Sequence, residues 1–281
     1  MRYEIFFTTS ICVLVFAGCT ESPFQQKVDN PQGSQIRGQI ALNDLASPEG
    51  AYVWLEGANV STYTDQNGRF ELTLPQSSQN GVNGVFDLYI YLANYKFATA
   101  QTVVQDGKFL FAQADVNARG ELSGTLTIQK ILDISTAVTP SAVPKDFAGP
   151  ILVAVTLHAV LDSVDVVFPK MVGGLLGAVL FKKAETGEVF VDVPDVSART
   201  RFRDKVGNEP RAWVQTVFLG RGGISSSGVY EVIPYFFIEQ KELPPELISS
   251  LGVDVNEVQS VEAEFAGIPA KRAGGRLIVT D

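Results

Sequence analysis

The sequence predicts an all-β chain of two antiparallel β-sandwich domains that follow a signal peptide. Short segments of alternating apolar and polar residues recur along the chain, and turn residues (Gly, Pro, Asn and Asp) separate them. Only one short helical pattern interrupts them, after Pro244-Pro245. The 281 residues, 46% hydrophobic and 19% charged, suffice for two globular domains of about 100–150 residues each.

The amino terminus has the features of an export signal. The apolar stretch from Ile5 to Phe16 is too short to span a bilayer, which takes about 20 residues, and fits the apolar centre of a signal peptide. Val15-Phe16-Ala17-Gly18-Cys19 resembles the bacterial lipobox, with Phe16 where Leu is usual. This resemblance implies a lipoprotein signal peptide over residues 1–18 and a lipid anchor on Cys19.

A polar segment with Pro and Gly follows the anchor and predicts a flexible tether over residues 19–34. Thr20 is not the Asp that favours inner-membrane retention in enterobacterial lipoproteins. The resemblance therefore implies a lipid-anchored protein of the bacterial cell envelope, in the outer rather than the inner membrane.

The first domain is expected over residues 35–140. Its first four predicted strands are Ile36–Leu42, Ala51–Gly57, Thr62–Thr64 and Arg69–Leu74. The turn Asp65-Gln66-Asn67-Gly68 lies between the last two and predicts a hairpin, because Asn and Gly both tolerate positive φ.

These segments resemble a known family. Gly38, Ala51-Tyr52-Val53-Trp54-Leu55 with Gly57, Thr64 to Phe70, and Leu74-Pro75 are similar to the carboxypeptidase regulatory-like domain. The resemblance implies a transthyretin-like β-sandwich with later strands at Phe86–Leu92 and around Leu122–Leu132. It also implies an accessory module without catalytic residues of its own.

The second domain is expected over residues 148–281, after a linker at Val138–Pro144. The number of short strands favours an immunoglobulin-like sandwich. A turn at Glu185–Glu188 predicts a hairpin, and a short helix is expected from Pro244-Pro245 to Gly252. The predicted strands are Ile151–Leu161, Gly187–Val193, Arg211–Leu219, Val229–Glu239, Gln259–Phe265 and Arg276–Thr280.

The composition excludes several kinds of chemistry. Cys12 lies in the signal peptide and Cys19 is the lipid site, so the mature chain has no disulfide. His158 is the only histidine, so a His/Cys zinc site cannot form, and no metal or cofactor is expected. The net charge of −9 disfavours nucleic-acid binding.

Three further features carry weaker signals. His158 has Asp162 and Asp165 nearby, but no nucleophile motif completes a triad. A calcium loop starting at Asp65 would need Glu at its twelfth position, which is Gln76. The apolar, glycine-rich run Met171–Phe181 predicts a buried hairpin or loop, with a membrane- or partner-contacting loop as the alternative.

These observations favour a non-enzymatic envelope lipoprotein that serves as a binding or assembly module for a protein or glycan partner. One alternative is carbohydrate binding, with Trp54 and Trp213 as the leading aromatic platforms. Another is a hydrolase with a carboxylate site, since 31 acidic residues could supply a carboxyl pair. The further aromatic candidates for a sugar site are Tyr52, Tyr63, Tyr230 and Tyr235.

Overall fold

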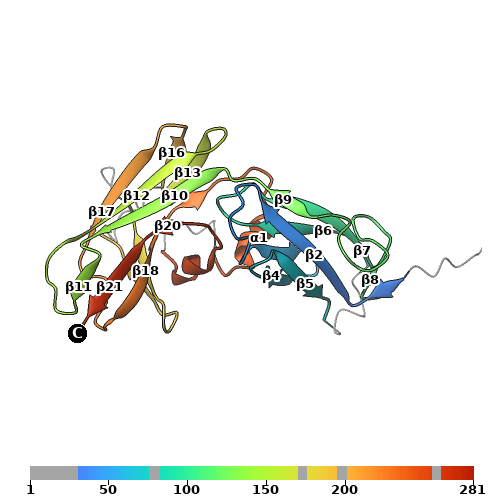
Figure 1. Cartoon of the computed structure of the whole chain (residues 1–281), viewed down its shortest axis with the longest axis horizontal. Coiled ribbons are helices and arrows are strands. Elements are labelled where there is room, and N and C mark those ends of the chain that lie inside the picture. Colours follow the sequence, from blue (N-terminus) through green and yellow to red (C-terminus); the bar gives the residue numbers. More distant parts are fainter. Residues whose placement is uncertain (1–30, 76–82, 170–175, 195–200, 255–260) are drawn as a thin grey trace, which may run out of the picture. The chain divides into compact units, whose positions relative to one another are not determined.

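The structure is a computed structural model that describes residues 31–75, 83–169, 176–194, 201–254 and 261–281. The described residues form strands, one short α-helix and one short 3-10 helix (Figure 1). Most described strand pairs are antiparallel, and three short pairs are parallel. The predicted all-β class is therefore confirmed. The predicted signal peptide, Cys19 and the tether up to residue 30 lie outside the described residues.

The first sandwich has a six-stranded and a three-stranded sheet. Alternate residues of one strand of the smaller sheet, Ile36, Ile40 and Leu42, point into the core between the two sheets, as their spacing predicts. The six-stranded sheet has the order β1 (Gln32–Gly33), β8 (Lys108–Leu110), β7 (Ala98–Gln105), β6 (Gly84–Tyr91), β3 (Tyr52–Leu55) and β4 (Val60–Tyr63). The three-stranded sheet has the order β5 (Arg69–Thr73), β2 (Gln35–Leu42) and β9 (Leu126–Ile128). Since β1 pairs with β8, the end of the expected 19–34 tether belongs to a sheet.

The turn at Asp65–Gly68 differs from the predicted hairpin. It connects β4 and β5, which belong to different sheets, so it forms a corner between the layers. Gly68 has φ +75°, whereas Asn67 has no positive φ. One Asp65 carboxylate oxygen instead accepts the backbone amides of Asn67 at 2.9 Å and Arg69 at 2.8 Å. The Asp side chain therefore shapes the turn, and only the glycine needs the left-handed backbone.

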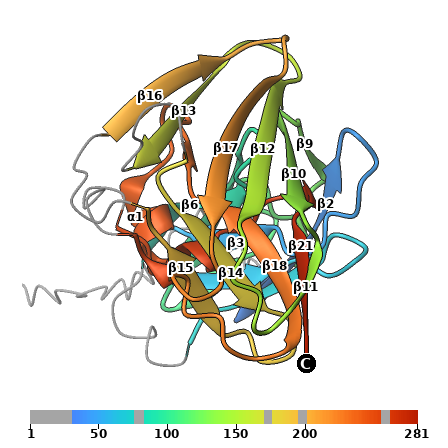
Figure 2. The same ribbon diagram turned by 90° about the vertical axis from the view of Figure 1, so that its left-hand side faces the viewer.

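The second sandwich has three sheets, and Figure 2 shows β10, β12 and β17 side by side. The four-stranded sheet has the order β17 (Arg211–Val217), β12 (Ile151–Ala159), β10 (Leu132–Thr139) and β20 (Ala273–Gly274). The five-stranded sheet has the order β11 (Ala142–Pro144), β21 (Arg276–Thr280), β18 (Gly228–Pro234), β14 (Val179–Lys183) and β15 (Val189–Asp192). The small sheet has the order β16 (Arg201–Val206), β13 (Val164–Pro169) and β19 (Phe237–Ile238).

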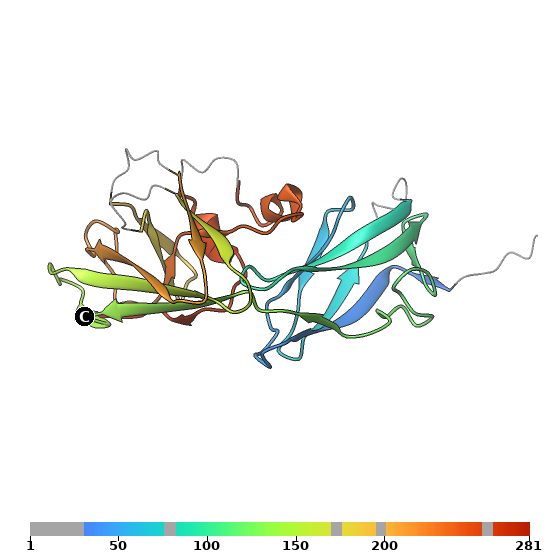
Figure 3. The ribbon, with the colours of Figure 1, turned by 90° about the horizontal axis from the view of Figure 1, so that it is seen from above.

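The expected linker at 138–144 is not a linker in the structure. β10 pairs with β12 along its whole length, and β11 pairs with β21. The chain therefore enters the second sandwich by Leu132, within the range expected for the first domain. The colours of Figure 3 follow this passage from the blue strands of the first sandwich to the red carboxyl-terminal strand.

Three local predictions in the second sandwich have clear outcomes. The hairpin around Glu185–Glu188 is confirmed, because β14 pairs with β15 and Gly187 has φ +75°. The prediction that Met171–Phe181 is buried is confirmed for residues 176–181, which are all buried. Residues 171–175 lie outside the described residues. The predicted strand at 259–265 is wrong over its described part, because residues 261–262 belong to no strand and a 3-10 helix, η2 (Ala263–Gly267), begins at Ala263. The Ile268 N–H donates to the Phe265 carbonyl at 3.0 Å, a bond between residues three apart that belongs to a helical turn and not to a sheet.

A third cluster of buried apolar residues, named here the joint cluster, connects the two sandwiches. All four residues of β3 are buried: Val53 and Leu55 face the first core, while Tyr52 and Trp54 enter the joint cluster. Among the described residues, its buried members are Tyr52, Trp54, Tyr91, Ala93, Ala178, Leu180, Ile233, Tyr235, Leu247, Ile248, Val253, Phe265, Ala266 and Ile268. Residues 31–281 accordingly form one compact unit.

Candidate ligand pocket

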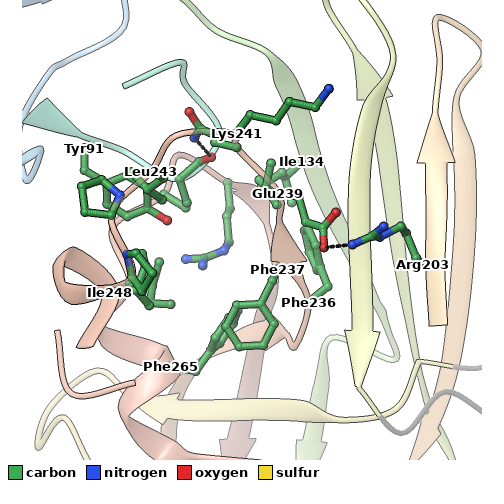
Figure 4. Close-up of a pocket in the computed structure, with 18 of the residues that line it drawn as sticks. Tyr91, Ile134, Arg203, Phe236, Phe237, Glu239, Lys241, Leu243, Ile248 and Phe265 are labelled. Carbon is green, nitrogen blue, oxygen red and sulfur yellow. Dashed lines mark hydrogen bonds and ion pairs between the residues drawn. The ribbon is translucent and has the colours of Figure 1, made fainter. Parts of the chain in front are cut away.

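A pocket of about 370 Å³ lies beside the joint cluster (Figure 4). Figure 4 shows Phe237 and Phe265 on one side of the central space, and Leu243 and Ile248 on another. The first sandwich contributes Tyr91 and Ala93 from the end of β6. The other walls come from β10, β16, β19 and the segment after it, α1 (Pro245–Ser249), and the stretch from η2 to Arg272. The volume falls in the range of about 300–1,000 Å³ that is usual for small-molecule sites.

The helix α1 forms one wall, and the sequence explains its short length. Pro245 occupies the first turn, where proline costs no hydrogen bond, and Gly252 follows the helix with φ +83°. This confirms the predicted helix. Ser250 donates its hydroxyl hydrogen to the carbonyl of Leu247 at 2.6 Å. The Tyr52 hydroxyl lies 2.8 Å from Ser250 Oγ and is therefore the donor of that second bond, which fastens the helix to β3.

Gln240 fastens the segment after β19 to the first sandwich. Its amide nitrogen donates to the carbonyls of Ala93 at 3.1 Å and Tyr95 at 2.9 Å. Its amide oxygen accepts the backbone N–H of Phe97 at 3.1 Å. All three bonds are to backbone groups of the first sandwich, so they fix the rim of the pocket next to Glu239 and Lys241.

Asn94 does the same for the segment before β20. It is fully buried, and its amide nitrogen donates to the carbonyls of Leu132 and Lys271, both at 3.0 Å. Its amide oxygen accepts the backbone N–H of Lys271 at 2.9 Å. The backbone around Arg272 is thereby held against the first sandwich.

The charges that line the pocket are unevenly partnered. Glu239 is bound by Arg203 at 2.6 Å and lies 3.8 Å from Arg201. Arg272 has no ion pair among the described residues, and its Nε is buried without a hydrogen-bond partner. Burial lowers the pKa of the Arg272 guanidinium, while the more distant Glu231 and Tyr91 act in the opposite direction. Burial likewise raises the pKa of Tyr91.

The prediction that Trp54 and Trp213 form exposed aromatic platforms is wrong. Trp54 and Trp213 are only 3% and 6% exposed, so neither indole can stack on a sugar. Trp54 belongs to the joint cluster and Trp213 to the core of the second sandwich. Tyr52, Tyr230 and Tyr235 are also buried. Only Tyr63, among the six candidates, is half exposed.

His158 lies on β12 and contacts a different acid from those nearest in sequence. Its Nδ1 is 3.7 Å from a carboxylate oxygen of Asp133 on the paired strand β10. Lys130 binds the same Asp133 at 2.6 Å and also Asp44 at 3.1 Å. His158 therefore adjoins a structural network of charges and does not line the pocket, and among the described residues it forms no ion pair with Asp162 or Asp165.

The remaining site predictions concern metals and the membrane. Within the described residues, no group of three or more His, Cys, Asp or Glu side chains could hold a metal ion. Asp65 uses its carboxylate on backbone amides of its own turn. Cys19, the predicted lipid site, lies outside the described residues. No helix in the described part of the chain is long and apolar enough to cross a membrane.

Sequence analysis missed the residues that build the pocket. Asn94 and Lys271 are 177 positions apart, and Gln240 and Ala93 are 147 apart. No short-range pattern connects such residues. A polar residue within the apolar run Tyr91-Leu92-Ala93-Asn94-Tyr95 is the one local signal, since a buried amide needs partners.

Comparisons with known proteins add little to this geometry. No family model and no curated protein matches the sequence. Among solved structures, a chain of a type II cohesin–X-dockerin complex from Acetivibrio cellulolyticus matches with a TM-score of 0.24 and 21% identity, covering 35% of this chain and 59% of that one. The major pilin subunit BcpA of Bacillus cereus matches with a TM-score of 0.23 and 12% identity, over 76% of this chain and 60% of the pilin. The Bacillus anthracis TIE protein matches with a TM-score of 0.23 and 10% identity, over 74% and 48%. At these scores no partner or activity is transferred.

Proposed function

We propose that this chain is a non-enzymatic, lipid-anchored protein of the bacterial cell envelope that binds a small, partly apolar ligand. The observation that carries the proposal is the pocket beside the joint cluster. It has walls of Phe, Ile, Leu and Pro side chains and a few charged groups, the composition that is usual for a ligand site. Hydrogen bonds from Asn94 and Gln240 fix two of its walls in advance.

A hydrolase acting through paired carboxylates receives less support from this pocket. Among the described residues that line it, the only carboxylate is Glu239, and two arginines neutralise it. A glycosidase-type mechanism needs two carboxyl groups, one that protonates the leaving group and one that acts as a base toward water or as a nucleophile. Binding without turnover is therefore the function that this arrangement favours.

A pocket-filling substitution tests the binding site. The uncharged dye N-phenyl-1-naphthylamine should gain fluorescence with the protein from Thr20 to Asp281. Ala270→Trp should abolish the gain, because Ala270 lines the pocket and an indole there would occupy it. Ala142→Trp, at an exposed position on β11, is the control and should bind the dye like the parent. Unchanged binding by Ala270→Trp would place the site elsewhere.

The lipid anchor needs a separate test. In bacteria that process lipoproteins, the full precursor should incorporate labelled fatty acid and fractionate with membranes. Cys19→Ser removes the acceptor sulfur, so it should lose the label. One acyl chain binds a membrane only marginally, at about 10⁴ M⁻¹, and several chains give stable retention. A Cys19→Ser protein that keeps the label would refute the proposed anchor.

A further inference from the structure

Arg272 is the charged group of the pocket for which the described residues supply no ion-pair partner. Among the described residues that line the space, four are cationic, namely Arg201, Arg203, Lys241 and Arg272, and Glu239 supplies the single carboxylate. Two of them share that carboxylate. Lys241 is exposed, so water and dissolved counter-ions stabilise its charge. Arg272 alone combines a buried, unpaired nitrogen with a place in the pocket wall.

An arginine whose Nε is buried without a hydrogen-bond partner is costly, even though the Arg272 residue as a whole is only partly buried. Taking a charge out of water costs several kcal/mol unless an opposite charge and hydrogen bonds compensate it. The fork of N–H groups on arginine fits a carboxylate with two parallel hydrogen bonds, among the strongest in proteins. The Arg272 site is thus incomplete in a way that an added carboxylate would correct.

The surroundings select the rest of the ligand. Buried apolar side chains face the same space, including Ile134, Phe236, Ile248, Phe265 and Ile268. Glu239, the one negative group among the described lining residues, is held by Arg203 at 2.6 Å and would repel an incoming anion only weakly. A hydrophilic anion such as phosphate would leave these apolar walls without contacts.

We propose that the pocket takes a small monocarboxylic acid with an apolar tail, whose carboxylate pairs with Arg272 while its tail lies on the phenylalanine and isoleucine walls. The assignment rests on the proposed function, because it names the ligand class of the same pocket. Asn94 acts as a positioning residue, since it holds the backbone of Lys271 immediately before Arg272.

Calorimetric titration of the protein from Thr20 to Asp281 with three ligands of equal tail length tests the assignment. Octanoate should bind, octan-1-ol should bind at least about tenfold more weakly, and octylammonium should not bind. Arg272→Gln should weaken octanoate by about 10- to 100-fold and leave octan-1-ol unchanged, because only the charged hydrogen bonds are lost. Arg272→Lys should keep part of the affinity. Arg276→Gln is the control and should behave like the parent, because Arg276 is exposed and does not line the pocket.

The outcomes separate the two proposals. If octanoate and octan-1-ol bind equally, with no effect of Arg272→Gln, the carboxylate assignment is overturned while the pocket remains a binding site. Failure of octanoate to bind a protein that still binds the neutral dye also overturns the assignment alone. If neither binds in the pocket, the proposed function fails as well. Thermal unfolding of each variant shows whether lost affinity reflects lost folding.

Discussion

Gly68 is the residue at which backbone conformation and packing together allow least variation. Its φ of +75° lies in the left-handed region, which residues with a Cβ rarely adopt. A Cβ at this position would collide with the backbone carbonyl oxygen of Ile40. That backbone cannot move freely, because the Ile40 N–H donates to the Gly68 carbonyl at 2.8 Å.

Gly68→Ala should therefore lower the free energy of unfolding by about 1–3 kcal/mol, and Gly68→Val by at least as much. Gly187→Ala is the matched control, because Gly187 has the same φ of +75° but open space where the Cβ would lie. It should cost about 1 kcal/mol for the backbone conformation alone. Urea unfolding measures both. Equal losses at the two glycines would show that the contact with Ile40 contributes nothing.

Residue-level prediction succeeded where chemistry is local and failed where burial decides. The need for glycine at position 68 follows from the turn sequence, although the turn proved to be a corner between sheets. Trp54 and Trp213 were assigned to a surface by residue type alone. Their burial depends on strands far away in sequence, namely β6 beside Trp54 and β12 beside Trp213.

At the scale of elements, an ion pair joins the end of β15 to the segment after β17. Asp192 is fully buried, and Arg221 binds its two carboxylate oxygens at 2.6 and 2.7 Å. Arg221 also donates to the Thr216 carbonyl at 2.6 Å. The hydrogen bonding that Arg221 donates to the Asp192 carboxylate is the main reason why the pKa of Arg221 is raised. The pair therefore links the five-stranded and four-stranded sheets of the second sandwich at one end.

Arg221→Met should destabilise the protein by about 3 kcal/mol, because it leaves the Asp192 carboxylate buried without its cation. Arg119→Met removes a comparable contact with Glu121, but both side chains there are exposed. That control should change the free energy of unfolding by about 0.5 kcal/mol or less. Denaturant midpoints compare the two. If Arg221→Met lowers the free energy of unfolding no more than Arg119→Met does, water stabilises the Asp192 carboxylate in place of the arginine.

Strand prediction depended on how clearly each segment alternates. β2, β5 and β21 have one buried and one exposed face, and their patterns predicted them. β7 was missed because its inward residues include Ala100 and Thr102, which give a weak hydrophobic signal. β14 was missed as a strand because Val179, Leu180 and Phe181 are buried on both faces. Such a run has no period from which to identify it.

At the scale of the whole molecule, the joint cluster sets how the two sandwiches unfold. Tyr52 and Trp54 of the first sandwich share it with Leu180, Ile233 and others of the second. The sequence predicted two sandwiches joined by a linker, and nothing local revealed that their outer faces would be covered. Separating them would expose large apolar side chains to water at about 25 cal/mol per Å². Residues 31–281 should therefore unfold in a single cooperative transition.

The two tryptophans can test this cooperativity, because they are the only ones in the chain and report on different places. In Trp213→Phe the fluorescence follows Trp54 in the joint cluster, and in Trp54→Phe it follows Trp213 in the second core. Both signals should give the same urea midpoint as circular dichroism of the same variant. Trp54→Phe removes no hydrogen bond, since the Trp54 Nε1 has no partner.

Weakening the joint cluster should separate the two signals if the cluster is what couples the sandwiches. Ile233 is fully buried in it, and Ile233→Ala should cost about 2–5 kcal/mol. Combined with each tryptophan variant, this substitution should move the Trp54 midpoint away from the Trp213 midpoint. Val153→Ala, within the second core only, should lower both midpoints together. The decisive comparison is between the two single-tryptophan variants without Ile233→Ala. If the Trp54 signal changes at lower urea than the Trp213 signal there, the sandwiches unfold independently, because the joint cluster then contributes too little free energy to couple their transitions.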